Sequence, residues 1–104
     1  MSHSTSYDVE LHPAAADELR RVEQRDTDAW DALTDLLEQA SQHRQPSELN
    51  SIQILHSYHG LLRLRAGNWR AVLELDKPRL IVWRIANRDD IDYQDLPKVR
   101  QRRG

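Results

Sequence analysis

The chain of 104 residues contains no cysteine. Disulfides, thiol catalysis and thiolate zinc sites are therefore excluded, and the composition suits a reducing cytoplasm. Only three glycines are present, and they form no glycine-rich phosphate-binding loop. The histidines show no metal-ligand spacing, so the sequence predicts neither a metal nor another cofactor. No apolar run is long enough to cross a membrane, which predicts a cytoplasmic protein without a membrane partner.

Charge is distributed unevenly along the chain. The net charge is −2, but residues 1–51 hold eleven acidic residues against four arginines. The second half reverses this balance, with eleven lysines and arginines against six acidic residues. A basic half favours a polyanionic partner, whereas the acidic half disfavours non-specific binding of nucleic acid by the whole molecule. A partner is therefore expected to meet one basic surface specifically.

Hydrophobic periodicity predicts a single α+β domain over residues 7–104, preceded by a disordered polar lead-in at residues 1–6. The expected order is an N-terminal strand, a two-helix hairpin and a three-stranded antiparallel meander, all strands joining one mixed sheet packed on the helices. A short C-terminal helix from Asp95 follows. The expected strands are 7–11, 61–65, 69–75 and 80–86, the expected helices are 14–24 and about 26–42, and the turns of the meander are 66–68 and 76–78.

Strict alternation along the meander predicts two different sheet faces. One face is apolar, includes Trp69, Ile81 and Trp83, and is expected to be covered by the helices. The other carries a single acid, Glu74, and an arginine set comprising Arg63, Arg65, Arg70, Arg84 and Arg88. Guanidinium groups keep their charge and bind phosphate in bidentate fashion, so this face is a candidate phosphate-binding surface. The alternative is an ordinary solvated face of an amphipathic sheet.

Two segments carry a family resemblance. The segment LLRLRAGNWRAVL (61–73) and the segment IANRDDIDY (85–93), together with the order of elements, resemble the RelE/ParE superfamily of toxins from type II toxin–antitoxin systems. The resemblance covers about residues 7–96. In RelE-like members the corresponding sheet face binds mRNA in the ribosomal A site. The RNA's 2′-hydroxyl attacks the adjacent phosphate without a metal, so the resemblance implies an endoribonuclease.

The resemblance also implies roles for individual residues. Arg70 and Arg88 match arginines that stabilise the phosphate, Arg63 falls at the position of a catalytic lysine, and Tyr93 is near a C-terminal tyrosine of the site. Arg65 and Arg84 are expected to contact RNA. Leu61 replaces a second lysine of the family pattern, and arginine is a poor general base. His56 and His59 have suitable intrinsic pKa values for proton transfer, although no family motif places them in the site.

Three functions remain open at this stage. The first is a ribosome-dependent mRNA endonuclease, and the second is a ParE-type inhibitor of DNA gyrase, which has the same fold but no nuclease activity. The third is a non-toxic member retained for antitoxin binding. All three imply a cognate antitoxin, whose acidic segment would complement the arginine face.

Overall fold

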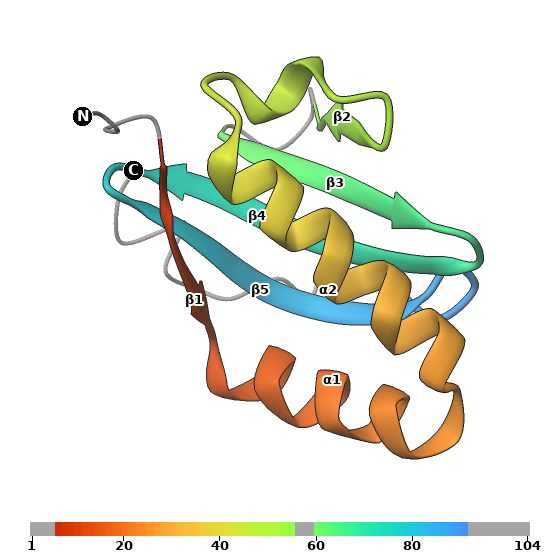
Figure 1. Cartoon of the computed structure of the whole chain (residues 1–104). Coiled ribbons are helices and arrows are strands. Elements are labelled where there is room, and N and C mark those ends of the chain that lie inside the picture. The colour runs from red at the N-terminus through yellow and green to blue at the C-terminus, as the bar shows by residue number, and fades with distance from the viewer. Residues whose placement is uncertain (1–5, 56–59, 92–104) are drawn as a thin grey trace.

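A computed structural model describes residues 6–55 and 60–91 of the chain. Within these residues, five strands form one sheet and two α-helices lie on one of its faces (Figure 1). In chain order the elements are β1 (Asp8–Leu11), α1 (Pro13–Arg25), α2 (Thr27–Gln42), the 3₁₀ helix η1 (Pro46–Glu48), β2 (Ile52–Ile54), β3 (Leu61–Ala66), β4 (Trp69–Asp76) and β5 (Arg79–Asn87). No helix in this part of the chain is long and apolar enough to cross a membrane.

The sheet has the strand order β1-β5-β4-β3-β2. β1 pairs in parallel with β5, and the other pairs are antiparallel, which confirms the predicted α+β fold with one mixed sheet. The second edge strand, β2, was not predicted, because three residues are too few to show a period of two. The predicted C-terminal helix from Asp95 lies outside the described residues.

Local sequence signals determine where both helices begin. Pro13 occupies the first turn of α1, where its missing N–H is no loss, and the His12 side chain accepts a hydrogen bond from the Ala14 N–H at 3.2 Å. Asp26 caps α2 by accepting from the Ala29 N–H at 3.1 Å. Because the two helices meet at Asp26, they form the predicted hairpin.

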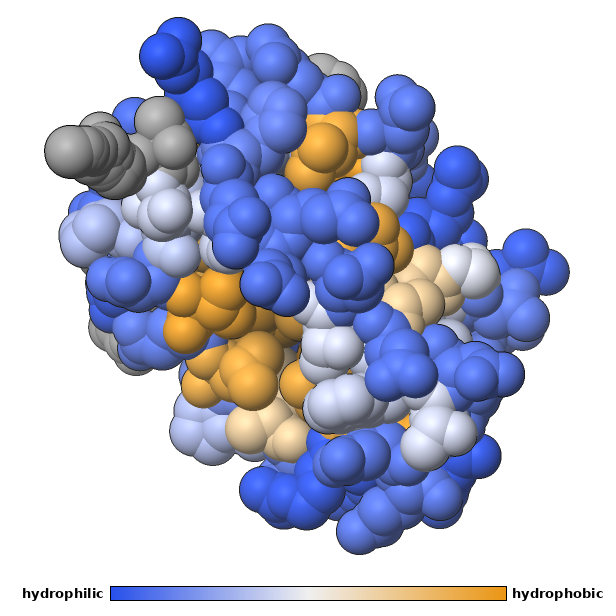
Figure 2. All heavy atoms as spheres, viewed as in Figure 1, coloured by the Kyte–Doolittle hydropathy of each residue, from blue (hydrophilic) through white to orange (hydrophobic). Residues whose placement is uncertain are grey.

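The helix hairpin covers the face of the sheet that faces the viewer in Figure 1. The predicted apolar stripes are confirmed, since Ala15 and Val22 of α1 and Leu33, Leu37 and Ala40 of α2 are buried in one cluster with strand residues. The strand residues of this cluster are Ile52, Leu62, Leu64, Ala66, Ala71, Leu73, Leu80, Val82 and Ile85. In the same view, apolar surface shows where the helices diverge beside β1 (Figure 2). The helices therefore leave part of this core close to solvent.

The predicted face assignment on β5 is wrong for most of the strand. Leu80 and Val82 face the helices, whereas Ile81 and Trp83 lie in a second cluster with Leu61 and Val72. The register shifts between β4 and β5, so that Val72 pairs with Arg84 while Leu73 pairs with Val82. This bulge adds one residue to β5, and a strict period of two cannot anticipate it.

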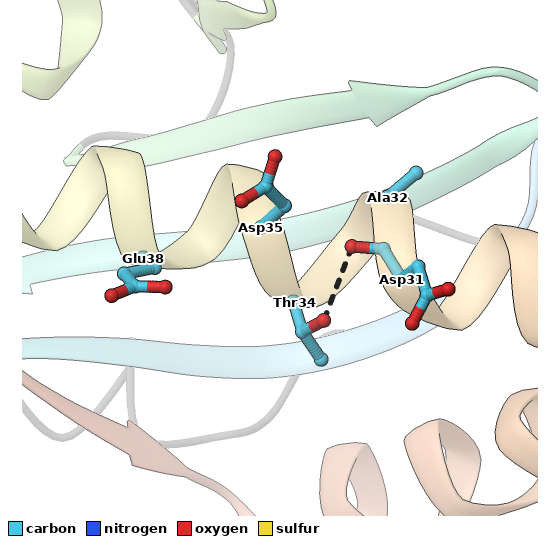
Figure 3. A pocket seen from close by; sticks show the side chains of 5 residues that line it. All are labelled: Asp31, Ala32, Thr34, Asp35 and Glu38. Atoms are coloured by element: carbon cyan, nitrogen blue, oxygen red, sulfur yellow. Dashed lines mark hydrogen bonds between the residues drawn. The ribbon is translucent and has the colours of Figure 1, made fainter.

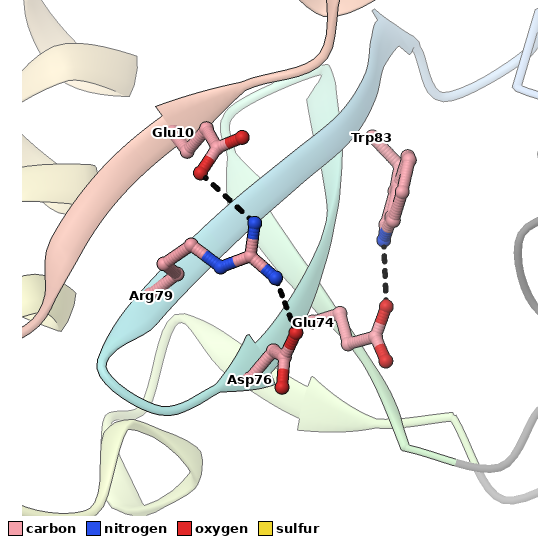
Figure 4. Close-up of polar contacts among 5 residues, drawn as sticks. All are labelled: Glu10, Glu74, Asp76, Arg79 and Trp83. Atoms are coloured by element: carbon pink, nitrogen blue, oxygen red, sulfur yellow. Dashed lines mark hydrogen bonds and ion pairs between the residues drawn. The ribbon is translucent and has the colours of Figure 1, made fainter. Parts of the chain in front are cut away.

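A buried carboxylate belongs to the second cluster. Glu74 is 3% exposed, and its Oε1 accepts a hydrogen bond of 3.0 Å from the Trp83 indole Nε1–H (Figure 4). The prediction of Glu74 as the single acid of a wet arginine face is therefore corrected. Its pairing with Trp83 follows the rule that a buried charge needs a hydrogen-bonding partner.

Arg79 connects β1 to the turn of the β4–β5 hairpin through two ion pairs (Figure 4). Its Nη2 donates to Asp76 Oδ2 at 2.5 Å and its Nη1 to Glu10 Oε1 at 3.3 Å. The hydrogen bond that Arg79 donates to Asp76, and then the charge of Glu10, raise the pKa of the guanidinium. This arginine therefore has a structural role at the parallel edge of the sheet.

Candidate functional site

The turn between β3 and β4 brings three arginines to one end of the sheet. Arg65 and Arg70 are directly opposite each other across the two strands, so both side chains leave from the same face. The backbone N–H of Arg88 donates to the Asn68 carbonyl at 2.7 Å, which places Arg88 beside the same turn. Gly67 makes the turn possible with a φ of 61°, in the left-handed region that favours glycine. We call Arg65, Arg70 and Arg88 the turn arginines.

The Arg70 side chain is held in place by the turn itself. Its Nη1 donates to the carbonyls of Gly67 at 2.7 Å and Trp69 at 2.9 Å. Arg65 and Arg70 are like charges placed directly opposite each other on neighbouring strands, an arrangement that is unfavourable by itself. A phosphate bound between them would relieve this repulsion. The geometry therefore favours an anion-binding role over that of a neutral solvated surface.

Arg63 lies on the same face, two residues along β3 from Arg65. Its Nη2 hydrogen-bonds to Gln53 Oε1 on β2, and Gln53 and Arg63 are paired residues in the ladder. Arg63 thus lies farther from the turn and helps to hold the edge strand. The predicted placement of Arg63 on the arginine face is confirmed, and its predicted role in catalysis stays a prediction.

Arg84 lies on the same face by register, since Val72 pairs with both Arg63 and Arg84, but its guanidinium is turned toward α1. Its Nε and Nη2 donate to Glu18 Oε2 of α1 at 3.0 and 2.8 Å. Glu18 Oε1 also accepts from the Ile85 N–H at 2.7 Å, so one carboxylate binds both the arginine and the strand backbone. The bulge in β5 leaves Arg84 opposite Val72, on the face predicted for it, whereas residues 80–83 before it lie on the faces opposite to those predicted.

Glu18 is the important residue that the sequence reasoning missed. It lies three residues after Ala15 and four before Val22, so its spacing follows the buried stripe of α1. An acidic residue at stripe spacing is the signal that could have identified it.

Replacing Glu18 with alanine is expected to lower the free energy of unfolding by about 2–3 kcal/mol, because both charge-assisted hydrogen bonds and the partner of the Ile85 N–H are lost. Urea denaturation followed by circular dichroism measures the change. Glu23→Ala is the control, since Glu23 is an exposed residue of the same helix and its replacement should stay within about 0.5 kcal/mol. Equal effects of the two substitutions would contradict this assignment.

Three predicted site residues lie outside the described residues: Tyr93, His56 and His59. Among residues 6–55 and 60–91, no group of three histidine, aspartate or glutamate side chains is placed to hold a metal ion. The structure thus supports the turn arginines as the described part of a candidate anion site.

The exposed side of α2 has the opposite charge. A shallow hollow there is lined by Asp31, Ala32, Thr34, Asp35 and Glu38, and Thr34 Oγ1 donates to the Asp31 carbonyl at 3.1 Å (Figure 3). Three carboxylates at this surface would repel a phosphate. This side of α2 is therefore a poor candidate for binding a polyanion.

No protein-family model and no curated protein sequence matches this chain. Solved structures do match. The YoeB dimer from Staphylococcus aureus superposes with a TM-score of 0.64 at 16% identity, covering 74% of this chain and 91% of that chain. The toxin–antitoxin complex RelBE2 from Mycobacterium tuberculosis gives a TM-score of 0.61 at 19% identity, covering 86% and 100%. The DinJ–YafQ complex from E. coli gives 0.58 at 14%, covering 83% and 97%.

These similarities extend over nearly the whole length of the matched chains. The chain therefore has the fold of the RelE/YoeB-type toxins.

Proposed function

We propose that this chain is the toxin of a type II toxin–antitoxin system and that it cleaves mRNA on the ribosome. The observation that carries the proposal is the convergence of the turn arginines, on a fold otherwise found in YoeB, RelE and YafQ proteins. Arginine binds phosphate in bidentate fashion and stays charged at every physiological pH. The proposed activity would act in the cytoplasm, where the ribosomes are.

The proposed reaction is attack of an RNA 2′-hydroxyl on the adjacent phosphorus. The bond from phosphorus to the 5′-oxygen breaks, leaving a cyclic phosphate and a free 5′-hydroxyl. Arg70 and Arg88 would stabilise the extra negative charge of the pentacoordinate transition state. Because Arg70 is already fixed by two carbonyls of the turn, little reorganisation is needed when the phosphate arrives.

The other predicted residues have supporting parts in this proposal. Arg65, opposite Arg70, would bind a neighbouring phosphate, and Arg63 would contact the RNA farther along β3. Arg84, whose guanidinium pairs with Glu18, would contact the RNA from the middle of β5. Tyr93 would stack on a base or assist proton transfer, and His56 or His59 would serve as proton carriers.

The proposed partner is a cognate antitoxin. RelBE2 and DinJ–YafQ, two of the similar structures, are toxin–antitoxin complexes. An acidic antitoxin segment would complement the basic second half of this chain, which holds eleven lysines and arginines against six acidic residues.

One observation favours a second candidate, a gyrase inhibitor without nuclease activity. Arg63 hydrogen-bonds to Gln53, and Arg84 forms an ion pair with Glu18. Arginines held by side chains of their own protein can stabilise the fold without taking part in a reaction. A protein that acts only by binding needs no proton-transfer group. This candidate shares the antitoxin partner and differs in its target.

Purified protein added to a translation extract separates the two candidates. The nuclease proposal predicts cuts in a translated mRNA and none in the same RNA without ribosomes, with free 5′-hydroxyl ends that polynucleotide kinase labels directly. A parallel assay measures DNA supercoiling by gyrase at micromolar toxin. Inhibited supercoiling with intact mRNA would replace the nuclease proposal by the gyrase candidate, and no effect in either assay would indicate a non-toxic member.

A further inference from the structure

A cavity of about 250 Å³ lies between the last turns of α1 and the end of β5. Its walls include Arg21 and Arg25 from α1, Arg84 and Asn87 from β5, and Trp69 from the start of β4. Trp69 packs against the helix-side core and pairs with Asn87 in the sheet. The cavity therefore lies on the helix-facing side of the same sheet end that carries Arg65 and Arg70 on its other face.

The charges around this cavity are unbalanced. Glu18 already binds Arg84, which leaves Asp90 as the other acidic residue of the lining to face Arg21 and Arg25. Within the described part of the chain, neither Arg21 nor Arg25 forms an ion pair. They are four residues apart on one helix, a spacing at which like charges disfavour the helix. The dipole of α1 favours Arg25 in its last turn but gives no such reason for Arg21.

Size and composition indicate what this cavity accepts. It is smaller than the pockets that hold drug-sized ligands or cofactors, which are about 300–1,000 Å³. A single large side chain with its neighbours fits such a space. Tryptophan and arginine are the residue types most enriched at the energetic centres of protein–protein interfaces. A half-buried Trp69 between arginines therefore favours a protein partner that presents an acidic side chain.

We propose that this cavity is an anchor site for the antitoxin, in which an aspartate or glutamate binds Arg21 and Arg25 while an adjacent apolar side chain packs on Trp69. The inference rests on the proposed function, because that function supplies the partner. Asn87 lines the cavity and Arg88 follows it directly, so a segment anchored here lies at the same end of the sheet as the turn arginines but on its helix-facing side. An antitoxin segment that continues from this anchor around the sheet end would reach the turn arginines on the other face.

RNA is the less favoured occupant. Two carboxylates, Glu18 and Asp90, line the cavity, and each would repel a phosphate group. Glu18 and Asp90 also repel the carboxylate of a partner's side chain. That carboxylate carries a single charge, however, and it needs to approach only Arg21 and Arg25. The exposed acidic surface of α2 belongs to the same helix hairpin and further disfavours a nucleic-acid strand.

The test uses the protein encoded by the reading frame that adjoins this chain's gene as the probe. Its affinity is measured by biolayer interferometry at physiological salt for the wild type and for the double variant Arg21→Glu/Arg25→Glu. We expect at least about 30-fold weaker binding, because the reversed charges meet a carboxylate in the cavity. The control is Arg20→Glu/Arg44→Glu, which changes the net charge equally at two exposed residues outside the cavity and should stay within about threefold. Arg21→Gln/Arg25→Gln replaces the double reversal if that variant does not fold.

The outcomes separate this inference from the proposed function. Tight binding by the wild type with equal affinities for the cavity and control variants would overturn the anchor site and leave the toxin proposal standing. Unchanged antitoxin binding with lost affinity for a fluorescein-labelled single-stranded RNA would also overturn it and assign the cavity to RNA. No binding of the wild type to the adjoining protein would count against the toxin–antitoxin proposal itself, and the anchor site would fall with it.

Discussion

Replacing Arg70 with alanine is expected to reduce RNA cleavage about 100- to 1,000-fold and to abolish growth arrest in cells. The guanidinium is fixed by two carbonyls of the β3–β4 turn, so the substitution removes a preorganised donor from the transition state. The magnitude is that of deleting one preorganised oxyanion donor in other enzymes. Cleavage in a translation extract, followed by primer extension, measures the effect.

The stability of this variant has to be measured as well, because Arg70 also supports the turn. Loss of its two exposed or half-buried hydrogen bonds is expected to cost about 1–2 kcal/mol, which a folded domain tolerates. Arg70→Lys keeps the charge but not the bidentate geometry, and an intermediate loss of activity is expected. Arg20→Ala, an exposed arginine of α1, serves as the neutral control. A folded Arg70→Ala protein that still arrests growth would remove Arg70 from the site.

Replacing Leu33 with alanine is expected to lower the free energy of unfolding by about 2–5 kcal/mol. Leu33 is fully buried where α2 packs on the sheet, so the substitution leaves a cavity that the surrounding residues fill only in part. Such a loss is a large fraction of the stability of a domain of this size. Urea denaturation followed by circular dichroism gives the number.

Leu36→Ala is the matched control for that measurement. Leu36 lies on the same helix and carries the same side chain, but it is only partly buried against the core. Its replacement should therefore cost clearly less than that of Leu33. A larger cost at Leu36 would contradict the observed orientation of α2 on the sheet.

Much of the fold follows from short-range patterns. The helix bounds follow from Pro13 and from the Asp26 cap, and the three meander strands from their β-branched and aromatic residues. The turn at Gly67 follows from the low cost of a positive φ at glycine. The joint apolar surface of the helices then predicts which layer covers the sheet.

The parts that could not be predicted depend on long-range pairing. The bulge in β5 depends on how β4 and β5 meet, and one added residue exchanges the faces of Leu80 and Trp83. The position of Arg84 depends on Glu18, which is 66 residues away in the chain. Similarly, the three residues of β2 form a strand because they pair with the edge of β3. The alternation of residues along a single strand does not show how that strand pairs with its neighbours.

The candidate site was therefore predicted in part. The pairing of Arg65 with Arg70 follows from a tight turn, a local feature, whereas the place of Arg88 beside that turn depends on the pairing of β5 with β4. Arg84 lies on the predicted face opposite Val72, but its ion pair with Glu18 of α1 was not predicted. The anchor cavity combines residues of α1, β4 and β5, and no local pattern indicates it.

Induced expression of the chain without its antitoxin, with primer extension on a translated messenger, tests the central claim most directly. The account predicts growth arrest within a few generations and cuts that map to codons in the ribosomal A site, both absent for Arg70→Ala. Arrest with intact messenger would contradict the nuclease activity and direct attention to gyrase. Normal growth at full expression of the wild type would contradict the assignment as a toxin.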